Sequence, residues 1–122
     1  MEIATPLADA LGRYLDLSTL ELKLTAQNMA NVDTPGYRTV GFDFAGEMAR
    51  SLDAMGPAGG GGAVAPQVAP VGGLLERPDG NDVSMDREGM KMAEAQLQFR
   101  TGVELLKQEF SRVMDAIHED QK

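Results

Sequence analysis

Two stretches of this 122-residue chain, one at each end, carry apolar residues at helical spacing. From Ile3 to Met29 apolar positions recur three and four residues apart, which predicts a long amphipathic helix. The helix begins either after Pro6 or one turn earlier, with Thr5 as its N-cap and Pro6 at the first position, where a missing N–H is harmless. Its main apolar stripe includes Leu11, Leu15, Leu22 and Met29.

The second stretch, from Ser84 to about Ile117, has the more regular pattern. Ser84 is a good N-cap, and Asp86 and Glu88 place negative charge in the first turn of the predicted helix. Further along, apolar residues alternate at intervals of four and three, the spacing of a coiled-coil seam. This seam consists of Phe99, Val103, Leu106, Phe110, Val113 and Ile117. At a rise of 1.5 Å per residue the helix would be roughly 50 Å long, which is too long for a small domain to cover.

A sharply specified turn follows the first helix. Asn31 favours local side-chain hydrogen bonds over continued helix, and Thr34 precedes a proline, which pushes it toward extended conformations. Thr34 to Tyr37 fits a type II turn, because Pro35 presets the first central position and Gly36 supplies the positive φ that the second requires. We therefore expect the first helix to end near Asn31.

The middle of the chain is less regular. Phe42 and Phe44 alternate as in a strand, and the residues from Glu47 to Arg50 could form a short helical turn. From Gly56 to Gly73 the sequence is mainly Gly, Ala, Pro and Val, with no charged residue. Such a segment loses much backbone entropy on ordering, so it is typical of a flexible loop.

These patterns divide the chain into four parts. Residues 1–38 form the N-terminal helix and turn, 39–54 an irregular segment, 55–76 a flexible loop, and 77–122 a second turn and the C-terminal helix. The predicted fold class is all-α: a coiled-coil hairpin of two long terminal helices, with room for a short strand pair in the irregular middle.

Composition limits what such a fold can do. Aromatic residues make up 5% of the chain and Trp is absent, so the apolar surface lies mainly in Leu, Val, Ala and Met, and an isolated chain buries little. A formal net charge of −8 argues against binding to nucleic acids or anionic membranes. The lack of Cys excludes disulfides and thiolate metal sites. We expect neither a membrane-spanning segment nor a cleavable Sec-type signal.

Candidate chemistry is sparse. The run from Gly59 to Gly62 has no following Lys and does not open a helix, so it is not a phosphate-binding loop. Asp79 and Asn81 alternate as calcium ligands do, but Val83 occupies the next ligand position. The sole histidine, His118, lies at the end of the last predicted helix without a nearby nucleophile. We therefore expect no enzyme activity, metal or cofactor.

The segment from Asn28 to Arg38 carries a family resemblance. It resembles the N-terminal signature of bacterial flagellar axial proteins, in which an Asn-x-Ala-Asn element runs into Thr-Pro-Gly-Tyr and a basic residue. The matching positions are Asn28, Ala30, Asn31, Thr34, Pro35, Gly36, Tyr37 and Arg38. The short length and the stretch from Arg77 to Asn81 are most similar to the basal-body rod family, and within it to subunits of the proximal rod. The resemblance covers both ends of the chain but not residues 55–75.

This resemblance implies a structural subunit whose terminal helices polymerise into the axial drive shaft needed for motility. Its implied partners are copies of itself, other rod proteins, the basal-body membrane ring with its rod adaptor, and the type III export gate. It would leave the cytosol through that gate and form part of the rod in the periplasmic space. Nucleic acid and direct membrane insertion are not expected.

Two alternatives stay open from the sequence. Tyr37 and Arg38 are candidates for contact with a neighbouring subunit, because the turn projects them beyond the helix, but the turn could instead fold back on its own helix pair. The whole chain could also be a soluble helical adaptor or export chaperone whose apolar stripe covers a client helix. That alternative predicts a folded dimer that stays in the cytosol.

Overall fold

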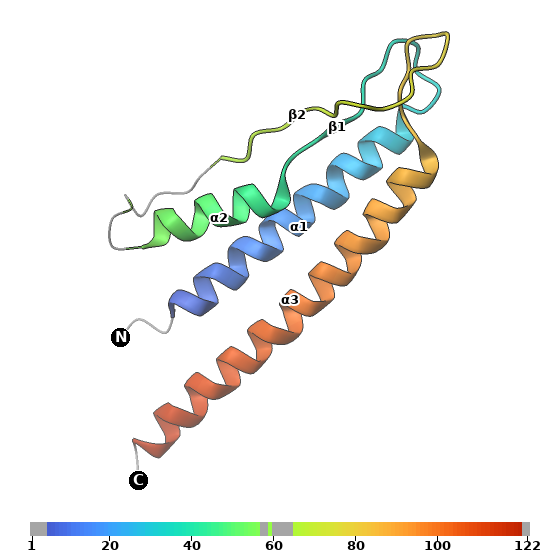
Figure 1. Ribbon diagram of the computed structural model, residues 1–122. Coiled ribbons are helices and arrows are strands. Elements are labelled where there is room, and N and C mark those ends of the chain that lie inside the picture. The colour runs from blue at the N-terminus through green and yellow to red at the C-terminus, as the bar shows by residue number, and fades with distance from the viewer. Residues whose placement is uncertain (1–4, 57–58, 60–64, 121–122) are drawn as a thin grey trace.

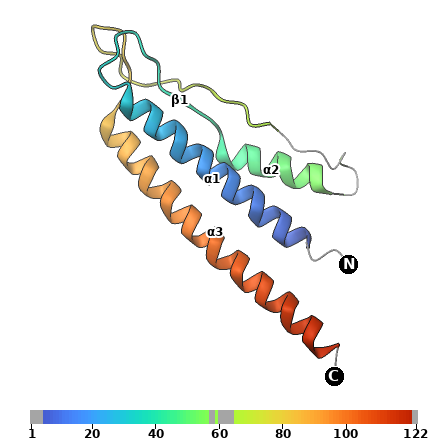
Figure 2. The same cartoon turned by 180° about the vertical axis from the view of Figure 1, so that it is seen from behind.

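The computed structural model describes residues 5–56, 59 and 65–120. Its elements follow in the order α1 (Pro6–Ala30), β1 (Val40–Gly41), α2 (Phe44–Met55), β2 (Ala69–Pro70) and α3 (Met85–Glu119). Helices α1 and α3 run antiparallel as a hairpin, and α2 lies along the other side of α1 (Figures 1 and 2). This confirms the predicted fold class, with two long terminal helices and a small strand pair in the middle.

Both long helices begin with the predicted caps. Thr5 Oγ1 accepts a hydrogen bond from Ala8 N at 3.0 Å, and Pro6 is the first residue of α1, so the second of the two predicted starts is correct. Ser84 Oγ accepts a bond from Arg87 N at 3.3 Å at the start of α3. The first helix was expected to end near Asn31, which agrees closely with the structure, because the last residue of α1 is Ala30.

Helix α3 is longer than its partner. It has 35 residues against 25 in α1, or about 52 Å against about 37 Å at the standard rise. Thr5 Oγ1 donates to Glu109 Oε1 at 2.9 Å, which aligns the start of α1 with a residue ten positions before the end of α3. The remaining turns of α3 therefore extend past α1 (Figure 1).

The two helices meet along positions spaced seven residues apart. The buried residues of α3 are Glu88, Ala95, Gly102 and Glu109, and those of α1 include Leu11, Ser18 and Thr25. At Gly102 a Cβ atom would lie 2.7 Å from Leu15 Cδ2, closer than atoms can pack. The hairpin therefore depends on small residues that let the two backbones approach.

The prediction of an irregular segment over residues 39–54 is wrong for most of its length, because α2 occupies Phe44–Met55. The alternation of Phe42 and Phe44 does not continue a strand, and Phe44 instead packs edge-on against Tyr14 of α1, with ring centroids 5.4 Å apart. The buried residues of α2 are Glu47 and Ser51, so its most buried positions are polar, although Phe44, Met48 and Leu52 recur at helical spacing beside them.

A two-stranded sheet joins the two sides of the middle segment. β1 and β2 are antiparallel, with Val40 opposite Pro70 and Gly41 opposite Ala69. Glycine fits closely at position 41, because a Cβ would lie 3.1 Å from Val71 Cγ2 and the valine side chain would have to shift. About a third of the predicted flexible loop, residues 57–58 and 60–64, lies outside the described residues, whereas its second half contains β2.

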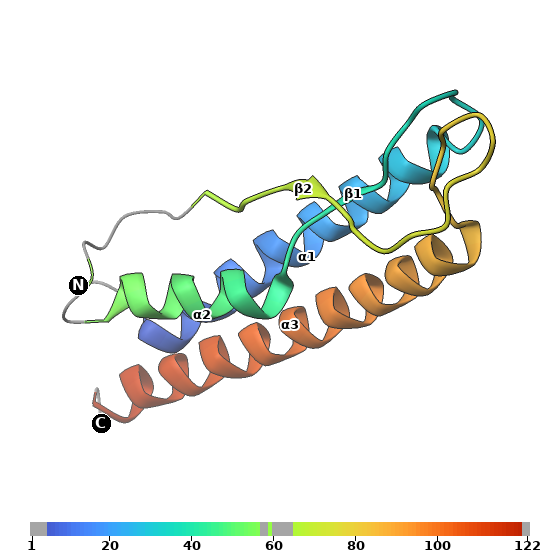
Figure 3. The ribbon, with the colours of Figure 1, turned by 45° about the horizontal axis from the view of Figure 1, so that its top comes forward.

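The described elements form three layers with α1 in the centre. Helix α3 packs against α1 alone, while α2 and β1 pack against another side of α1 (Figure 3). No helix in the described part of the chain is long and apolar enough to span a membrane.

Candidate assembly site

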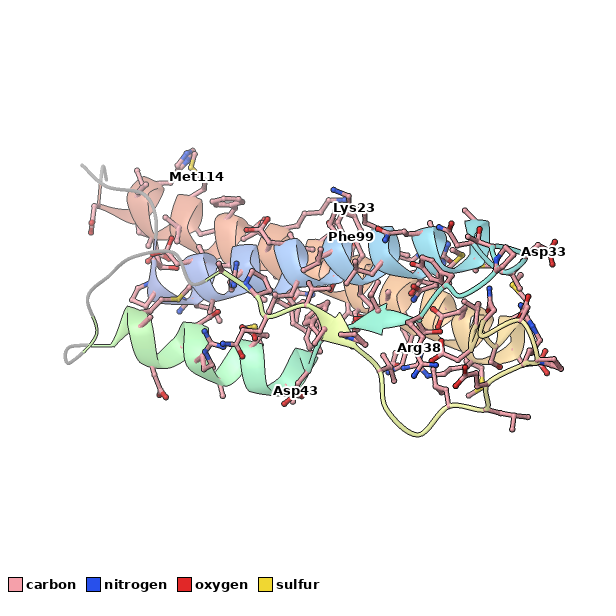
Figure 4. The ribbon with its side chains drawn as sticks, turned by 90° about the horizontal axis from the view of Figure 1, so that it is seen from above. Lys23, Asp33, Arg38, Asp43, Phe99 and Met114 are labelled. Carbon is pink, nitrogen blue, oxygen red and sulfur yellow. The ribbon has the colours of Figure 1, made fainter. Side chains whose placement is uncertain are left out.

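The segment that carries the family resemblance forms the turn predicted for it. Tyr37 N donates to Thr34 O at 3.2 Å, and Gly36 between them has a φ of 75°. With Pro35 at the preceding position, these features define a type II turn. The turn lies at the end of the hairpin where α1 finishes and α3 begins, the end marked by Asp33 in Figure 4.

Asn28 is the central residue of this end. Its side chain is 1% exposed and makes four hydrogen bonds, which is the full capacity of an amide. Nδ2 donates to Val40 O at 2.9 Å and to Glu88 Oε2 at 3.1 Å. Oδ1 accepts from Val40 N at 3.1 Å and from Tyr37 Oη at 2.9 Å. One asparagine thus connects α1, β1, the turn and α3.

Asn81 has a similar role from the other side. It is fully buried, and its Nδ2 donates to Asn31 O at 2.8 Å and to Thr34 O at 2.9 Å, while its Oδ1 accepts from Val83 N at 2.8 Å. The carbonyl groups just past the end of a helix have no partner within the helix. Asn81 supplies one, and so closes the C-terminal end of α1.

Further contacts lock the two turns together. Arg77 Nη2 donates to Val32 O, and Gly36 N donates to Asp79 O at 2.8 Å. Gly80 has a φ of 84°, and a Cβ on it would lie 3.3 Å from Gly36 Cα. We call residues 31–38 and 77–83 the turn pair. Its two positive-φ glycines lie against each other, because only glycine allows both the backbone angle and the close approach.

Tyr37 and Arg38 are both engaged within the chain. The Tyr37 hydroxyl donates to Asn28, and Arg38 Nη1 forms an ion pair with Glu76 at 2.9 Å. Of the two alternatives left open by the sequence, the turn folded back on its own helix pair is therefore the one observed. Arg38 remains 54% exposed (Figure 4). Contact of Tyr37 and Arg38 with a neighbouring subunit stays a prediction.

Asp82 holds the start of β1 against the turn pair. Its Oδ1 accepts a bond from Thr39 N at 2.6 Å, and Arg38 Nε lies 3.9 Å from its Oδ2. Burial alone would raise the pKa of Asp82, but the hydrogen bonds from Thr39 and the charge of Arg38 together lower it below its ordinary value. Asp82 is therefore an ionised anchor at neutral pH.

The other residues of the predicted motif are more exposed. Thr34 Oγ1 donates to Asn31 Oδ1 at 3.0 Å, and Asn31 Nδ2 donates to Gln27 O at 2.8 Å, so both stabilise the turn locally. Ala30 and Pro35 are exposed. Asn81, Asp82 and Glu88 complete the site but were not among the predicted site residues. The only signal for Asn81 was its place in the stretch from Arg77 to Asn81.

The predicted seam of α3 coincides only in part with the helix contact observed. Phe99, Leu106 and Val113 each lie four residues after a buried position and flank the contact. Val103, Phe110 and Ile117 lie further round the helix, and Phe110 is 47% exposed. On α1, Leu11 is buried, and Leu15, Leu22 and Met29 are half-buried. The seam as a surface between subunits stays a prediction. Figure 4 shows Phe99 on the side of the hairpin away from α2.

The described residues contain no group of three or more His, Cys, Asp or Glu side chains arranged to hold a metal ion. The site consists instead of buried amides, ion pairs and backbone groups. Its chemistry is that of a structural joint, in which polar side chains satisfy the open ends of helices and strands.

Comparison with known proteins identifies relatives of this chain. No family model matches the chain. It is 32% identical over 124 residues to the flagellar basal body rod protein FlgB of Cereibacter sphaeroides (strain ATCC 17023), covering 93% of this chain and 97% of the relative. It is 29% identical over 119 residues to FlgB of Salmonella typhimurium and 31% identical over 122 residues to FlgB of Escherichia coli K12, covering in each case 84% of this chain and 86% of the relative.

The hairpin, the turn pair and these relatives together define the class of protein, a structural subunit of the flagellar basal body rod. Within that class, the chain belongs to the family of the flagellar basal body rod protein FlgB.

Proposed function

We propose that this chain polymerises through its terminal helices as a subunit of the proximal rod, the base of the axial drive shaft, and is required for motility. One observation carries the proposal: the match to rod proteins extends over almost the full length of both chains, 93% of this one and 97% of the Cereibacter relative. The similarity therefore includes both helices and the turn pair, rather than one motif.

The exposed surface of the hairpin supports polymerisation. Several large apolar side chains of α3 are uncovered, including Met90 at 75%, Leu97 at 66% and Phe110 at 47% exposure. Complete burial of such a side chain stabilises an assembly by about 1.5–3 kcal/mol. The part of α3 that extends past α1 adds Met114, which is 47% exposed. Neighbouring subunits could cover these surfaces, and a filament results when the contacts do not close into a ring.

Membership of the rod-protein family supports the rest of the proposal, which concerns the other partners and the location. The subunit contacts copies of itself and other rod proteins, and it sits next to the basal-body membrane ring and its rod adaptor. It reaches the periplasmic space through the type III export gate without a Sec-type signal. Because an isolated chain covers few of its apolar groups, ordering is coupled to assembly, which also suits passage through a narrow channel.

Deletion of the gene followed by purification of basal bodies tests the proposal. We expect the protein in the basal-body fraction of wild-type cells, loss of swimming on deletion, and a mainly unfolded isolated monomer by circular dichroism. Complementation with Gly36→Val should not restore swimming, since valine is strained at a φ of 75°. A folded cytosolic dimer that is absent from basal bodies would contradict the rod assignment and favour an export chaperone.

A further inference from the structure

A groove runs along α1 between its two neighbouring layers. Helix α3 forms one wall. The other wall consists of β1, β2 and the segment between β1 and α2, and the elements of the two walls share no close backbone contact. Two adjoining cavities of about 410 Å³ and 220 Å³ make up this groove. Both cavities are lined by Glu21, Phe42, Asp43 and Lys91, so they lie next to each other along α1.

Glu21 is the unusual residue in this groove. It comes from the α1 floor and makes no hydrogen bond or ion pair with any other described residue, whereas Lys91 on the α3 wall lies 3.9 Å from Glu94 Oε2. Burial raises the pKa of Glu21, and Glu94 and Glu88 raise it further against the opposing effect of Lys91 and Arg87. The groove therefore contains a partly desolvated carboxylate that forms no direct ion pair with a described residue, although Lys91 and Arg87 lie near enough to oppose the rise in its pKa.

A matching cation lies on the outer face of α3. Arg100 is exposed and has no hydrogen bond or ion pair with the described residues. Leu97, three residues earlier, is 66% exposed, and Met90, seven residues before that, is 75% exposed. Positions 97 and 100 are each two residues from a buried position of α3, so they lie on the face opposite α1. The result is an apolar ridge with an unpaired guanidinium.

We propose that the groove of one copy binds the outer face of α3 of a second copy, with Leu97 against the apolar part of the groove and Arg100 paired with Glu21. The proposal rests on the assembly role above and adds the partner and the contact surface. Glu21 and Arg100 carry opposite charges, and neither forms a direct ion pair with a described residue, so the two surfaces are complementary at this point and the pair would fix the register of docking.

The geometry of this contact has a consequence for assembly. The groove and the ridge are different surfaces of one chain, so each bound copy still offers a free groove at one side and a free ridge at the other. Such heterologous contacts continue from copy to copy and build a filament when the rotation does not close. The lining of the groove is mixed, and its apolar side chains, which include Leu24, Val40 and Phe42, offer Leu97 of the ridge an apolar contact.

Charge reversal provides a direct test. Glu21→Arg places arginine in both groove and ridge, and Arg100→Glu places glutamate in both, so each variant alone repels itself. We expect about tenfold less of either variant in basal bodies than of the wild type. Co-expression of the two variants should restore incorporation, because each groove then meets a ridge of opposite charge. The double variant within one chain should also assemble.

Three comparisons keep the test specific. Lys23→Glu changes the charge by the same amount as Arg100→Glu does, but at an exposed position of α1 outside the groove. This variant should incorporate normally. Glu21→Gln removes the charge without added bulk, so it should reduce incorporation even if Glu21→Arg fails to fold. Wild-type protein absent from basal bodies would refute the rod function itself. Normal incorporation of Glu21→Gln and Arg100→Glu, or loss without rescue by co-expression and by the double variant, would refute only the groove contact.

Discussion

Replacement of Asn28 by alanine would remove four hydrogen bonds from the point where α1, β1, α3 and the turn meet. The largest cost arises at Glu88, whose side chain is 1% exposed and would lose its bond from the amide. Hydrogen bonds to charged groups contribute about 1.5–3 kcal/mol, and a buried carboxylate that loses such a bond adds a desolvation penalty of its own. Val40 and Tyr37 are half-exposed and can exchange their bonds with water.

We therefore expect Asn28→Ala to destabilise the folded chain by about 2–4 kcal/mol, a large share of the 5–15 kcal/mol typical of a whole domain. The measurement is a titration of the isolated chain with trimethylamine N-oxide followed by far-ultraviolet circular dichroism, since an osmolyte favours the folded state of a marginal chain. The variant should need more osmolyte to reach the same helix content.

Gln27→Ala is the matched control, because this exposed side chain donates only to the Tyr37 hydroxyl, at 3.3 Å. We expect its effect to stay within about 0.5 kcal/mol. Asn28→Asp adds a second test, since it places a carboxylate beside Glu88. Mutual repulsion raises the pKa of such a pair in the folded state, so the cost should be largest at high pH and shrink as the pH falls. Equal midpoints for Asn28→Ala and Gln27→Ala would refute the central role of Asn28.

Three further predictions use the same titration. Gly36→Val should lower the free energy of unfolding by about 1–2 kcal/mol or more, because the φ of Gly36 is 75°. Gly72→Val is the control and should cost less, because Gly72 has no positive φ and a Cβ there would have no atom within 4 Å. Gly102→Ala should destabilise the hairpin, because the new Cβ would lie 2.7 Å from a leucine of α1, while Gly89→Ala on the same helix has open space and should stabilise it by about 0.5–1 kcal/mol. Glu21→Gln should stabilise the isolated chain at neutral pH, and this gain should vanish as the pH falls below the ordinary carboxyl value of 4.5, because a raised pKa means that ionisation opposes folding.

Each of these predictions has a contrary result. Equal destabilisation at positions 36 and 72 would mean that backbone strain is unimportant in the turn. A stabilising Gly102→Ala would show that the helices are further apart than described. A Glu21→Gln chain that is less stable at neutral pH would imply that Glu21 already has a cationic partner in the isolated subunit.

Local chemistry made the ends of the long helices predictable. Thr5, Pro6 and Ser84 cap their helices through bonds that span three residues, and Gly36 satisfies a turn defined by four. Such features depend on near neighbours in the sequence, so they can be predicted without knowledge of the tertiary structure.

Packing that involves small or polar residues was not predictable in this way. A search for large apolar side chains finds Val103 and Phe110 but overlooks Ala95 and Gly102, whose small size admits the other helix. Helix α2 has a polar buried face, and its partners on α1 are distant in sequence. Sequence motifs marked both halves of the turn pair. The residues next to Asn81 in the sequence, however, do not indicate that its side chain caps α1.

The hydrogen bonds from Asn81 to the end of α1 also affect the order in which the chain can fold. The bond from Asn81 Nδ2 to Asn31 O joins residues 50 positions apart, and the loop between them must close before the end of α1 gains its partner. Contacts of such long sequence separation form late, because their entropic cost precedes their reward. A chain that emerges from a narrow passage with its N-terminus first would therefore present α1 with an open end until residues 77–83 arrive, so α1 gains its C-terminal partner only when the chain has been delivered as far as the start of α3.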